Sequence, residues 1–419
     1  MRLTLVLGAQ FGDEGKGKVV DFLASKADIV VRFNGGNNAG HTVVVAGKTY
    51  KFHLIPSGAV SGKACCLASG VAVNPKVLLE EIEMLQREGK ELKLIVDARA
   101  QIIMPYHILL DGAKEASAKK KIGTTKRGIG PCYADRAART GIRFAEFVDL
   151  ERFKERLKAV LPFKQKELSA YGLSCPNEEE ILKEHGNTCK KLKQYLGDVS
   201  LAVRDALKEG KQVLLEGAQG FFLDNDFGTY PYVTSSHPTT GGALIGVGIP
   251  PNLLDKIIGV AKAYCTRVGS GPFVTELADE LADTIRERGK EYGTTTGRPR
   301  RIGWLDLVML RTASRINGID ELAITKLDVL SGIEKLKICY AYKLDGKELK
   351  EVPADTALVE RCKPIYKEFD GFELPAEIKK LSDLPAQAEE YLKFIETELN
   401  VPIKIISYGP GRKDTLLID

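Results

Sequence analysis

Residues 8–20 read GAQFGDEGKGKVV, a glycine-rich stretch that contains two lysines and two acidic residues. The apolar run Leu3–Leu7 precedes it, and an apolar, helix-like run begins at Val19. A strand, a glycine-rich turn and a helix in this order favour a phosphate-binding loop, because glycine lets backbone N–H groups converge on phosphate oxygens. The stretch therefore predicts a phosphate site at the end of the first strand.

The loop departs from the common phosphate-loop pattern at two positions. Gly12, Gly17 and Lys18 have the usual spacing, but Val19 stands where a hydroxyl would reach magnesium. Asp13 places negative charge where phosphate is expected, which is tolerable if it binds a metal or acts as a catalytic base. A plain glycine-rich turn is the alternative interpretation, since this spacing alone is weak evidence.

The composition of the 419-residue chain is that of a globular protein with one large α/β unit or two to three domains. A net charge of +5 is small for 61 basic and 56 acidic residues, so we expect no nucleic-acid partner. The eight cysteines have no zinc-like spacing, and unpaired cysteines favour a reducing, cytoplasmic location. No apolar run approaches the roughly 18 residues of a membrane span, so we expect no membrane association.

Short apolar runs alternate with amphipathic stretches and predict a doubly wound, largely parallel sheet. The expected strands are Leu3–Leu7, Ile29–Arg32, Leu94–Val96, Val213–Glu216, Ile257–Ala261 and Leu322–Ile324. The charged, glycine-poor segment Glu151–Lys208 predicts a helical subdomain. Further on, Asp345-Gly346 between alternating runs predicts a hairpin.

We therefore expect an α/β fold with a large, mostly parallel central sheet flanked by helices. It would be P-loop-like at its first strand, with a helical subdomain and a C-terminal α+β subdomain. The limits that we assign are residues 1–100 and 205–272 for the central core, 101–204 for the helical subdomain and 273–419 for the C-terminal subdomain. Ligands in such folds lie at the carboxyl ends of the strands, where many polar glycine loops here predict a large site for several substrates.

The segment Thr325-Lys326-Leu327-Asp328 suggests which base a nucleotide would carry. A carboxylate can accept hydrogen bonds from both N1–H and the exocyclic amine of guanine, while a lysine stem covers the ring. An ordinary ion pair at a strand end is the alternative. Together with the phosphate loop, the segment predicts a guanine-nucleotide site.

His41 ends the polar loop Asn37–His41, which follows the second expected strand. A histidine beside flexible backbone can protonate a leaving oxygen, although a surface-turn histidine is equally compatible with the pattern. His53 is expected to be a half-buried strand residue instead.

The loop Gly293–Arg301 places three arginines in four positions after a run of threonines. Arginine binds carboxylates and phosphates at two points, so the loop suits a small dianionic substrate. A solvated basic loop is the alternative. Further basic, glycine- or hydroxyl-rich loops occur at Ile122–Pro131, Glu216–Gly220 and Gly228–Ser236.

In combination these segments resemble the adenylosuccinate synthetase family, whose members join IMP and aspartate with GTP. The resemblance extends essentially from end to end and includes the valine at position 19. It rests on the segments Gln10–Lys18, Asn38–His41, Gly123–Pro131, Glu216–Gly220, Gly228–Ser236, Thr295–Arg301, Thr325–Asp328 and Ser407–Pro410.

The resemblance implies that GTP phosphorylates the 6-oxygen of IMP and that the aspartate amine then displaces phosphate. It implies that Asp13 takes the N1 proton of IMP and binds Mg²⁺ together with the Gly40 carbonyl. The other catalytic residues would be His41 at the departing β-phosphate, Lys16 at the transferring phosphoryl group, and Gln219.

The binding residues implied by the resemblance form three sets. Those for IMP are Asn38, Thr125, Arg139, Gln219, Thr234 and Arg298. Those for aspartate are Thr295, Thr296, Arg298 and Arg127. Those for GTP are Gly12, Gly15, Lys16, Gly17, Lys18, Thr42, Arg300, Lys326, Asp328, Ser407 and Gly409. Arg139 would reach IMP from the neighbouring subunit, which implies a homodimer.

Three other classes of protein share single features with this chain. A regulatory GTP switch shares the phosphate loop and Thr325–Asp328, but it has no need of the arginine and threonine loops. A nicotinamide-binding oxidoreductase is disfavoured because Gly12, Gly15 and Gly17 do not fit its spacing. A nucleic-acid-binding protein is disfavoured by the small net charge.

Overall fold

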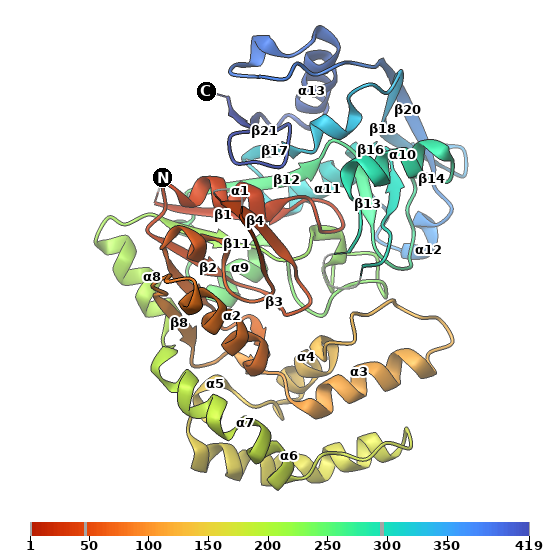
Figure 1. Ribbon diagram of the computed structural model, residues 1–419. Helices are drawn as coiled ribbons and strands as arrows, with labels where there is room; N and C mark the ends of the chain where they lie inside the picture. The colour runs from red at the N-terminus through yellow and green to blue at the C-terminus, as the bar shows by residue number, and fades with distance from the viewer. Residues whose placement is uncertain (1, 46–47, 294–296, 419) are drawn as a thin grey trace.

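A ten-stranded sheet forms the centre of the protein in the computed structural model, which describes residues 2–45, 48–293 and 297–418 (Figure 1). Its neighbouring strands pair in parallel, except for the antiparallel last pair. In spatial order the strands are β10 (Leu196–Gly197), β8 (Leu94–Asp97), β6 (Ala64–Leu67), β2 (Ile29–Arg32), β11 (Val213–Glu216), β1 (Leu3–Gly8), β12 (Lys256–Lys262), β17 (Glu321–Thr325), β21 (Ile403–Ser407) and β22 (Thr415–Leu417). All six predicted strands lie in this sheet, and the predicted fold class is confirmed.

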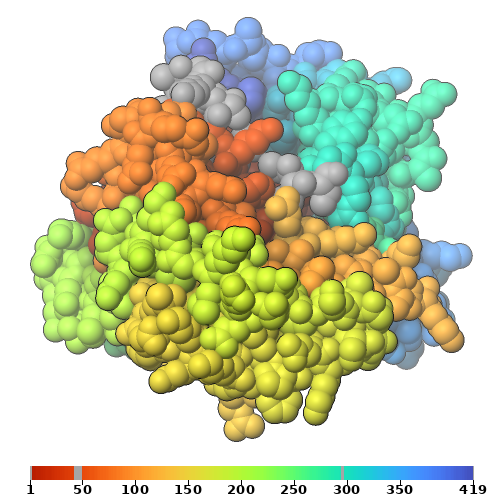
Figure 2. Space-filling view, turned by 60° about the horizontal axis from the view of Figure 1, so that its bottom comes forward, coloured from red at the N-terminus to blue at the C-terminus, as the bar shows by residue number. Residues whose placement is uncertain are grey.

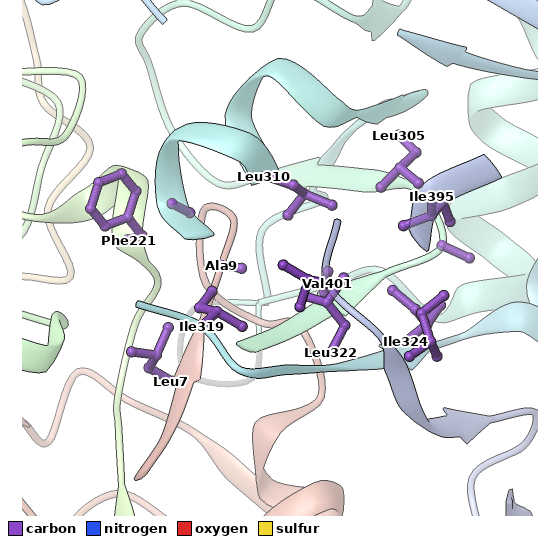
Figure 3. Packing of buried hydrophobic residues seen from close by; sticks show 14 of the residues in the cluster. Leu7, Ala9, Phe221, Leu305, Leu310, Ile319, Leu322, Ile324, Ile395 and Val401 are labelled. Carbon is purple, nitrogen blue, oxygen red and sulfur yellow. The ribbon is translucent and has the colours of Figure 1, made fainter. Parts of the chain in front are cut away.

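The central strands are buried on both faces, as expected for a parallel sheet covered by helices. All six residues of β1 are buried. On one side of the sheet, Leu7 of β1 and Ile324 of β17 belong to a core that includes Leu310 and Ile395 from two covering helices (Figure 3). Full burial of each such side chain contributes roughly 1.5–3 kcal/mol, so this core fixes the sheet on which the site is built.

The helices follow the strands in alternation and are amphipathic where they cover the sheet. One of the amphipathic stretches forms α2 (Pro75–Arg87), which is capped at its N-terminus by the Asn74 side chain. The longer helices are α1 (Lys16–Ala24), α2 (Pro75–Arg87), α3 (Pro105–Ser117), α4 (Ile129–Ala138), α6 (Leu150–Ser169), α7 (Glu178–Leu192), α8 (Val199–Lys208), α9 (Thr240–Val247), α10 (Glu280–Gly289), α11 (Leu307–Asn317) and α13 (Ala386–Leu399). The short ones are α5 (Phe144–Phe147) and α12 (Thr356–Val359).

The helices α3, α4, α6 and α7 form a layer below the sheet in the view of Figure 1. Within this layer, α6 and α7 lie on the side that faces away from the sheet (Figures 1 and 2). The segment predicted to be helical contains α6, α7 and α8, so that prediction is confirmed. A buried polar network joins three of the helices, since Asp135 of α4 contacts His107 Nε2 of α3 (3.0 Å) and Lys164 Nζ of α6 (2.6 Å). On α7, His185 is buried, and neither ring nitrogen has a hydrogen-bond partner among the described residues.

The C-terminal part adds a smaller sheet made of β16 (Leu305–Asp306), β18 (Lys335–Leu344), β19 (Lys347–Leu349) and β20 (Lys363–Asp370). The predicted hairpin is the β18–β19 pair, which turns at Asp345 and Gly346 with positive φ angles. The domain limits stay a prediction, and β17, β21 and β22 from the C-terminal residues extend the central sheet. Small accessory ladders are formed by β3 (Gly35–Gly36), β7 (Val71–Val73) and β9 (Gln101–Ile102), by β13 (Cys265–Arg267), β14 (Glu276–Leu277) and β15 (Arg301–Gly303), and by β4 (His41–Val45) and β5 (Lys48–Phe52).

All eight cysteines are free thiols, and all but Cys175 are buried. Among the described residues, no helix has the length and apolar character needed to cross a membrane.

Candidate active site

The phosphate loop connects β1 to α1 with an unusual backbone. Gly12, Asp13 and Gly15 have φ angles of 85°, 59° and 90°, a left-handed region that glycine adopts without strain. Gly15 is the N-cap of α1 and contributes no side-chain cap, so the first backbone N–H groups of the helix are left to a ligand. This helix end is a ready anion site, and Gly15, Lys16, Gly17 and Lys18 line a cleft there.

Glu14 holds this loop in shape, a role that the sequence analysis did not assign. Its fully buried carboxylate accepts hydrogen bonds from the backbone N–H groups of Gln10 (3.0 Å) and Gly12 (2.8 Å). Lys16 Nζ pairs with the other oxygen of the same carboxylate. The charge of Lys16 is thus balanced inside the loop, and the second acid is structural rather than exposed to ligand.

Asp13, in contrast, faces the cleft and pairs with an arginine of the loop at residues 293–301. Arg300 Nε lies 2.9 Å from Asp13 Oδ2, while Arg300 Nη1 lies 2.5 Å from a carboxylate oxygen of Glu291. Glu291 is in turn bonded to Lys262 Nζ of β12 at 2.8 Å. An alternating row of four charges therefore runs from the central sheet to the phosphate loop.

His41 is the first residue of β4 and lies beside Glu216, the last residue of β11. Its Nδ1 is hydrogen-bonded to the fully buried carboxylate of Glu216, which also accepts bonds from the Ser57 backbone and hydroxyl groups (2.9 Å each). Burial raises the pKa of Glu216, but His41 and Ser57 outweigh it, so that the pKa lies below its usual value. The carboxylate fixes the orientation of the ring, and Nε2 is the nitrogen that can serve a ligand in the cleft.

Gln219 is presented to the cleft by a turn just after β11. Its backbone is left-handed (φ 61°), and its Nε2 donates to Asn38 Oδ1 at 3.2 Å. Asn34 supports the turn, because its amide bonds both the N–H and the C=O of Ala218. Gly35 has a φ angle of 75°, which glycine adopts without strain, and a Cβ atom there would lie within 2.7 Å of Gln219 Oε1.

The loop between α3 and α4 forms the opposite wall and is anchored by two carboxylates of α3. Glu115 accepts from the Gly123 N–H (2.8 Å), and Asp111 accepts from the Gly128 N–H (2.9 Å). Arg298 Nη2 reaches across to the Gly123 carbonyl at 2.9 Å. Thr125, between these anchors, lines the cleft.

The cleft has a volume of about 680 Å³ and gathers most of the predicted residues. These residues come from loops and element ends that are far apart in the sequence, and the fold brings them together around one cleft. The predicted residues that line it are Gly12, Asp13, Gly15, Lys16, Gly17, Lys18, Asn38, Gly40, His41, Thr125, Gln219, Thr234, Arg298, Arg300 and Lys326.

The predicted base-binding residues lie beside this cleft, around Lys18. Lys18 Nζ donates to Ser407 Oγ (2.6 Å) and to the carbonyls of Gly409 (2.6 Å) and Asp414 (2.9 Å). Burial lowers the pKa of Lys18 to about 8, and nearby Asp414 and Asp328 oppose that shift. Asp328 is half-buried, and burial raises its pKa against the opposing charge of Lys326.

Besides Asp328, Ser407 and Gly409, two predicted residues with described side chains do not line the cleft, and three others have no described side chain. Arg139 is exposed at the end of α4, and Arg127 is half-buried in the preceding loop; neither lines the cleft. Thr42 belongs to β4, but its side chain lies outside the described residues, as do Thr295 and Thr296 altogether. Arg301, the third arginine of its loop, turns away from the cleft and pairs with Glu276.

Four residues that shape the site had no assigned role from the sequence: Glu14, Glu216, Lys262 and Glu291. Each is a buried charged residue. The hydrogen-bond partners of Glu216, Lys262 and Glu291 are distant in the chain, and those of Glu14 depend on the conformation of the phosphate loop. Glu216 had a usable signal, since a carboxylate that ends a buried apolar strand points into the region where ligands bind.

A family model of adenylosuccinate synthetase matches residues 5–416 of this chain. Among curated proteins, the adenylosuccinate synthetase of Caldanaerobacter subterraneus subsp. tengcongensis is 49% identical over 425 residues, which cover 100% of this chain and 99% of the relative. That of Thermodesulfovibrio yellowstonii is 50% identical, with 100% and 99% covered.

Solved structures agree with this similarity. A fully ligated adenylosuccinate synthetase from Plasmodium falciparum superposes with a TM-score of 0.94 at 40% identity, and both chains are covered completely. A succinoaminodeoxyadenylate synthetase of cyanophage S-2L, bound to dGMP and dATP, has a TM-score of 0.66 at 20% identity, with 99% and 95% covered. The second likeness concerns the fold alone.

Proposed function

This chain belongs to the adenylosuccinate synthetase family, and from that premise we propose that the cleft described above performs the family's reaction with the residues named below. The reaction joins IMP and L-aspartate with GTP, passes through 6-phosphoryl-IMP and releases GDP and phosphate, yielding adenylosuccinate for AMP biosynthesis. The observation that carries the assignment is the meeting of Asp13, His41 and Gln219 with the open N-terminus of α1 in one cleft.

In the first step, Asp13 takes the proton from N1 of IMP, and the 6-oxygen attacks the γ-phosphorus of GTP. Transfer of the phosphoryl group needs positioning and charge stabilisation more than covalent chemistry. The N–H groups at the start of α1 and Lys16 stabilise the transferring group. His41 donates from Nε2 to the phosphate oxygen that departs with GDP, and Glu216 holds its ring in place.

In the second step, the aspartate amine attacks C6 of 6-phosphoryl-IMP and inorganic phosphate leaves. The phosphate is a far better leaving group than the original amide-like oxygen, which explains why GTP is used first. Arg298 and Arg127, with Thr295 and Thr296, bind the carboxylates of aspartate. Asn38, Thr125, Gln219 and Thr234 bind IMP.

We also propose Mg²⁺ as the metal. Asp13 and Gly40 line the same cleft, and Mg²⁺ prefers carboxylate and carbonyl oxygens as ligands beside phosphate. When bound, the ion neutralises charge on the nucleotide phosphates.

The guanine base of GTP lies in this proposal against Lys326 and Asp328, with Ser407 and Gly409 beside it. Lys18 supports this placement, because its ammonium group ties the phosphate loop to Ser407 and Gly409. Gly12, Gly15, Gly17, Thr42 and Arg300 complete the GTP set.

The active form in this proposal is a homodimer in which Arg139 serves the neighbouring site. Two observations support it: Arg139 is exposed outside the cleft of its own subunit, and the large apolar side chains of Phe227, Tyr230 and Ile245 are exposed. The eight free cysteines support a cytoplasmic location.

The test combines GTP, IMP, aspartate and Mg²⁺ and follows formation of the modified purine while each component is omitted in turn. We expect product only in the complete mixture and almost no GTP hydrolysis without IMP. Rapid hydrolysis of GTP alone would instead favour a regulatory GTP switch.

A further inference from the structure

Glu291 is a buried carboxylate that no step described above uses. It follows α10, and its side chain is fully buried. Its oxygens accept hydrogen bonds from Lys262 Nζ (2.8 Å), the Tyr264 hydroxyl (2.6 Å) and Arg300 Nη1 (2.5 Å). Burial raises the pKa of Glu291, but the charges of Lys262 and Arg300 outweigh it and bring the pKa to about 2. The group is therefore a carboxylate at any pH where the enzyme works.

Arg300 is held by Glu291 on one side of its guanidinium group and touches Asp13 with the other. The backbone of Arg300 is fixed as well, because its N–H donates to the Glu291 carbonyl and its carbonyl accepts from Arg286 Nε (2.9 Å each). A guanidinium group is planar and rigid, so a bond at Nη1 sets the direction in which Nε points.

The anchor behind Glu291 is the central sheet itself. Lys262, on β12, is 1% exposed, and its ammonium group also donates to Thr266 Oγ1 at 2.7 Å. A charge buried this deeply is retained when it is paired, because an unpaired buried ion is very costly. Glu291 therefore neutralises Lys262 and also links the loop that carries Arg300 to the rigid strand β12.

We propose that Glu291 is a positioning residue for phosphoryl transfer, holding the Arg300 guanidinium group beside Asp13 at the GTP phosphates. This inference rests on the proposed function, since it assigns Glu291 to the same reaction. Glu291 does not touch the reacting atoms and acts through Arg300. The IMP-binding residues Asn38 and Gln219 lie on other elements, so their geometry does not depend on it.

The first experiment replaces the carboxylate with an amide of the same shape, Glu291→Gln. We expect kcat to fall about 10- to 100-fold, the loss typical of a reacting geometry that is no longer held. The KM for IMP should change less than kcat does, because Asn38, Thr125, Gln219 and Thr234 lie on other loops and only Arg298 shares the loop of Arg300. The exposed Glu287→Gln, four residues earlier on α10, is the matched control and should keep the wild-type kcat.

Glu291→Gln also leaves Lys262 buried without its ion pair, so loss of stability has to be separated from loss of positioning. The double variant Lys262→Met/Glu291→Gln removes both charges and should recover most of the Tm. Its kcat should nevertheless stay low, because Arg300 still has no carboxylate behind it. A double variant with the wild-type kcat would show that Glu291 is merely structural and would overturn the proposal.

A second test asks whether Glu291 acts through Arg300. Glu291→Gln introduced into an Arg300→Met background should lower kcat by less than about 2-fold further, because residues that act as a unit are not additive. An equal loss in both backgrounds would contradict the proposal. Failure of the proposed function is distinguishable from either result, since the wild-type enzyme would then form no adenylosuccinate.

Discussion

Asp13 occupies a left-handed position in the phosphate loop, with its carboxylate in the cleft and paired with Arg300. We expect Asp13→Ala to abolish product formation, because the N1 proton of IMP then has no acceptor and the 6-oxygen stays a weak nucleophile. GTP binding should survive at least in part, since Gly15, Lys16 and Gly17 remain. Product assays and calorimetric titration with GTP measure the two effects, and full activity would refute the role as base.

In the proposed site, Asp328 is the residue that distinguishes guanine from other bases. Asp328→Asn replaces one of the two acceptors that guanine requires with a donor, so the preference for GTP should weaken by roughly 10- to 100-fold, or about 1–3 kcal/mol. The comparison of kcat/KM for GTP with that for ATP and ITP measures it. If the ratios match those of the wild type, the base is recognised elsewhere.

For individual residues, the sequence predicted the candidate site residues in loops but not the buried charged residues that hold them in place. Lys16, His41 and Gln219 could be selected because polar groups that follow buried strands converge at one edge of a sheet. Glu291 could not, since a lone glutamate after a helix has no local pattern. Its partner Lys262 lies 29 residues earlier and its role exists only in the folded chain.

Some of the individual strands could be predicted from the sequence, and others could not. The six predicted strands are apolar runs with clear boundaries, and their burial on both faces produces that pattern. The strands β6 and β21 escaped prediction, the first as four residues reading ACCL and the second within a lysine- and glutamate-rich region. The two-residue strand β10 forms because it pairs with β8. Local strand propensity does not predict such a pairing.

The helix α7 carries a testable pH response in His185. Both ring nitrogens lack hydrogen-bond partners among the described residues, and Glu184 Oε1 stands 3.8 Å away, itself paired with Lys76. Burial lowers the pKa of His185 to about 4. The folded chain therefore keeps the ring neutral while the unfolded chain takes up a proton below about pH 6.5.

Stability should consequently fall as the pH drops from about 6.5 towards 4, by up to about 3 kcal/mol from this one group. His185→Leu should remove that part of the pH dependence, because the replacement has no titrating group. Urea unfolding of both proteins at pH 7 and pH 5 measures the difference. Identical pH dependence in the two proteins would exclude His185 as its source.

For the whole molecule, the proposed sharing of a site between subunits gives the clearest test. Arg139→Leu should raise the KM for IMP, because the cation that reaches IMP from the neighbouring subunit in this proposal is lost. Mixing it with Asp13→Ala subunits should restore part of the activity, since a mixed dimer has one site with both native residues. Absence of rescue after confirmed subunit exchange would argue against a shared site.

The pairing of C-terminal segments with the central sheet is the part of the fold that local sequence patterns could not predict. The charged helical segment and the Asp-Gly hairpin are local patterns, and both were predicted. The continuation of the central sheet into β17, β21 and β22 is not local, because it depends on pairing between segments that are far apart in the chain. The assigned domain limits, which were drawn from composition, stay a prediction.

Lys18 joins the phosphate loop to Ser407, a partner 389 residues later in the chain. Proteins are synthesised from the N-terminus, so the phosphate loop leaves the ribosome long before Ser407, Gly409 and Asp414 are translated. In the proposed function, a nascent chain therefore lacks part of its GTP site until its last residues are translated. A chain that ends before Ser407 should therefore bind GTP more weakly than the full chain.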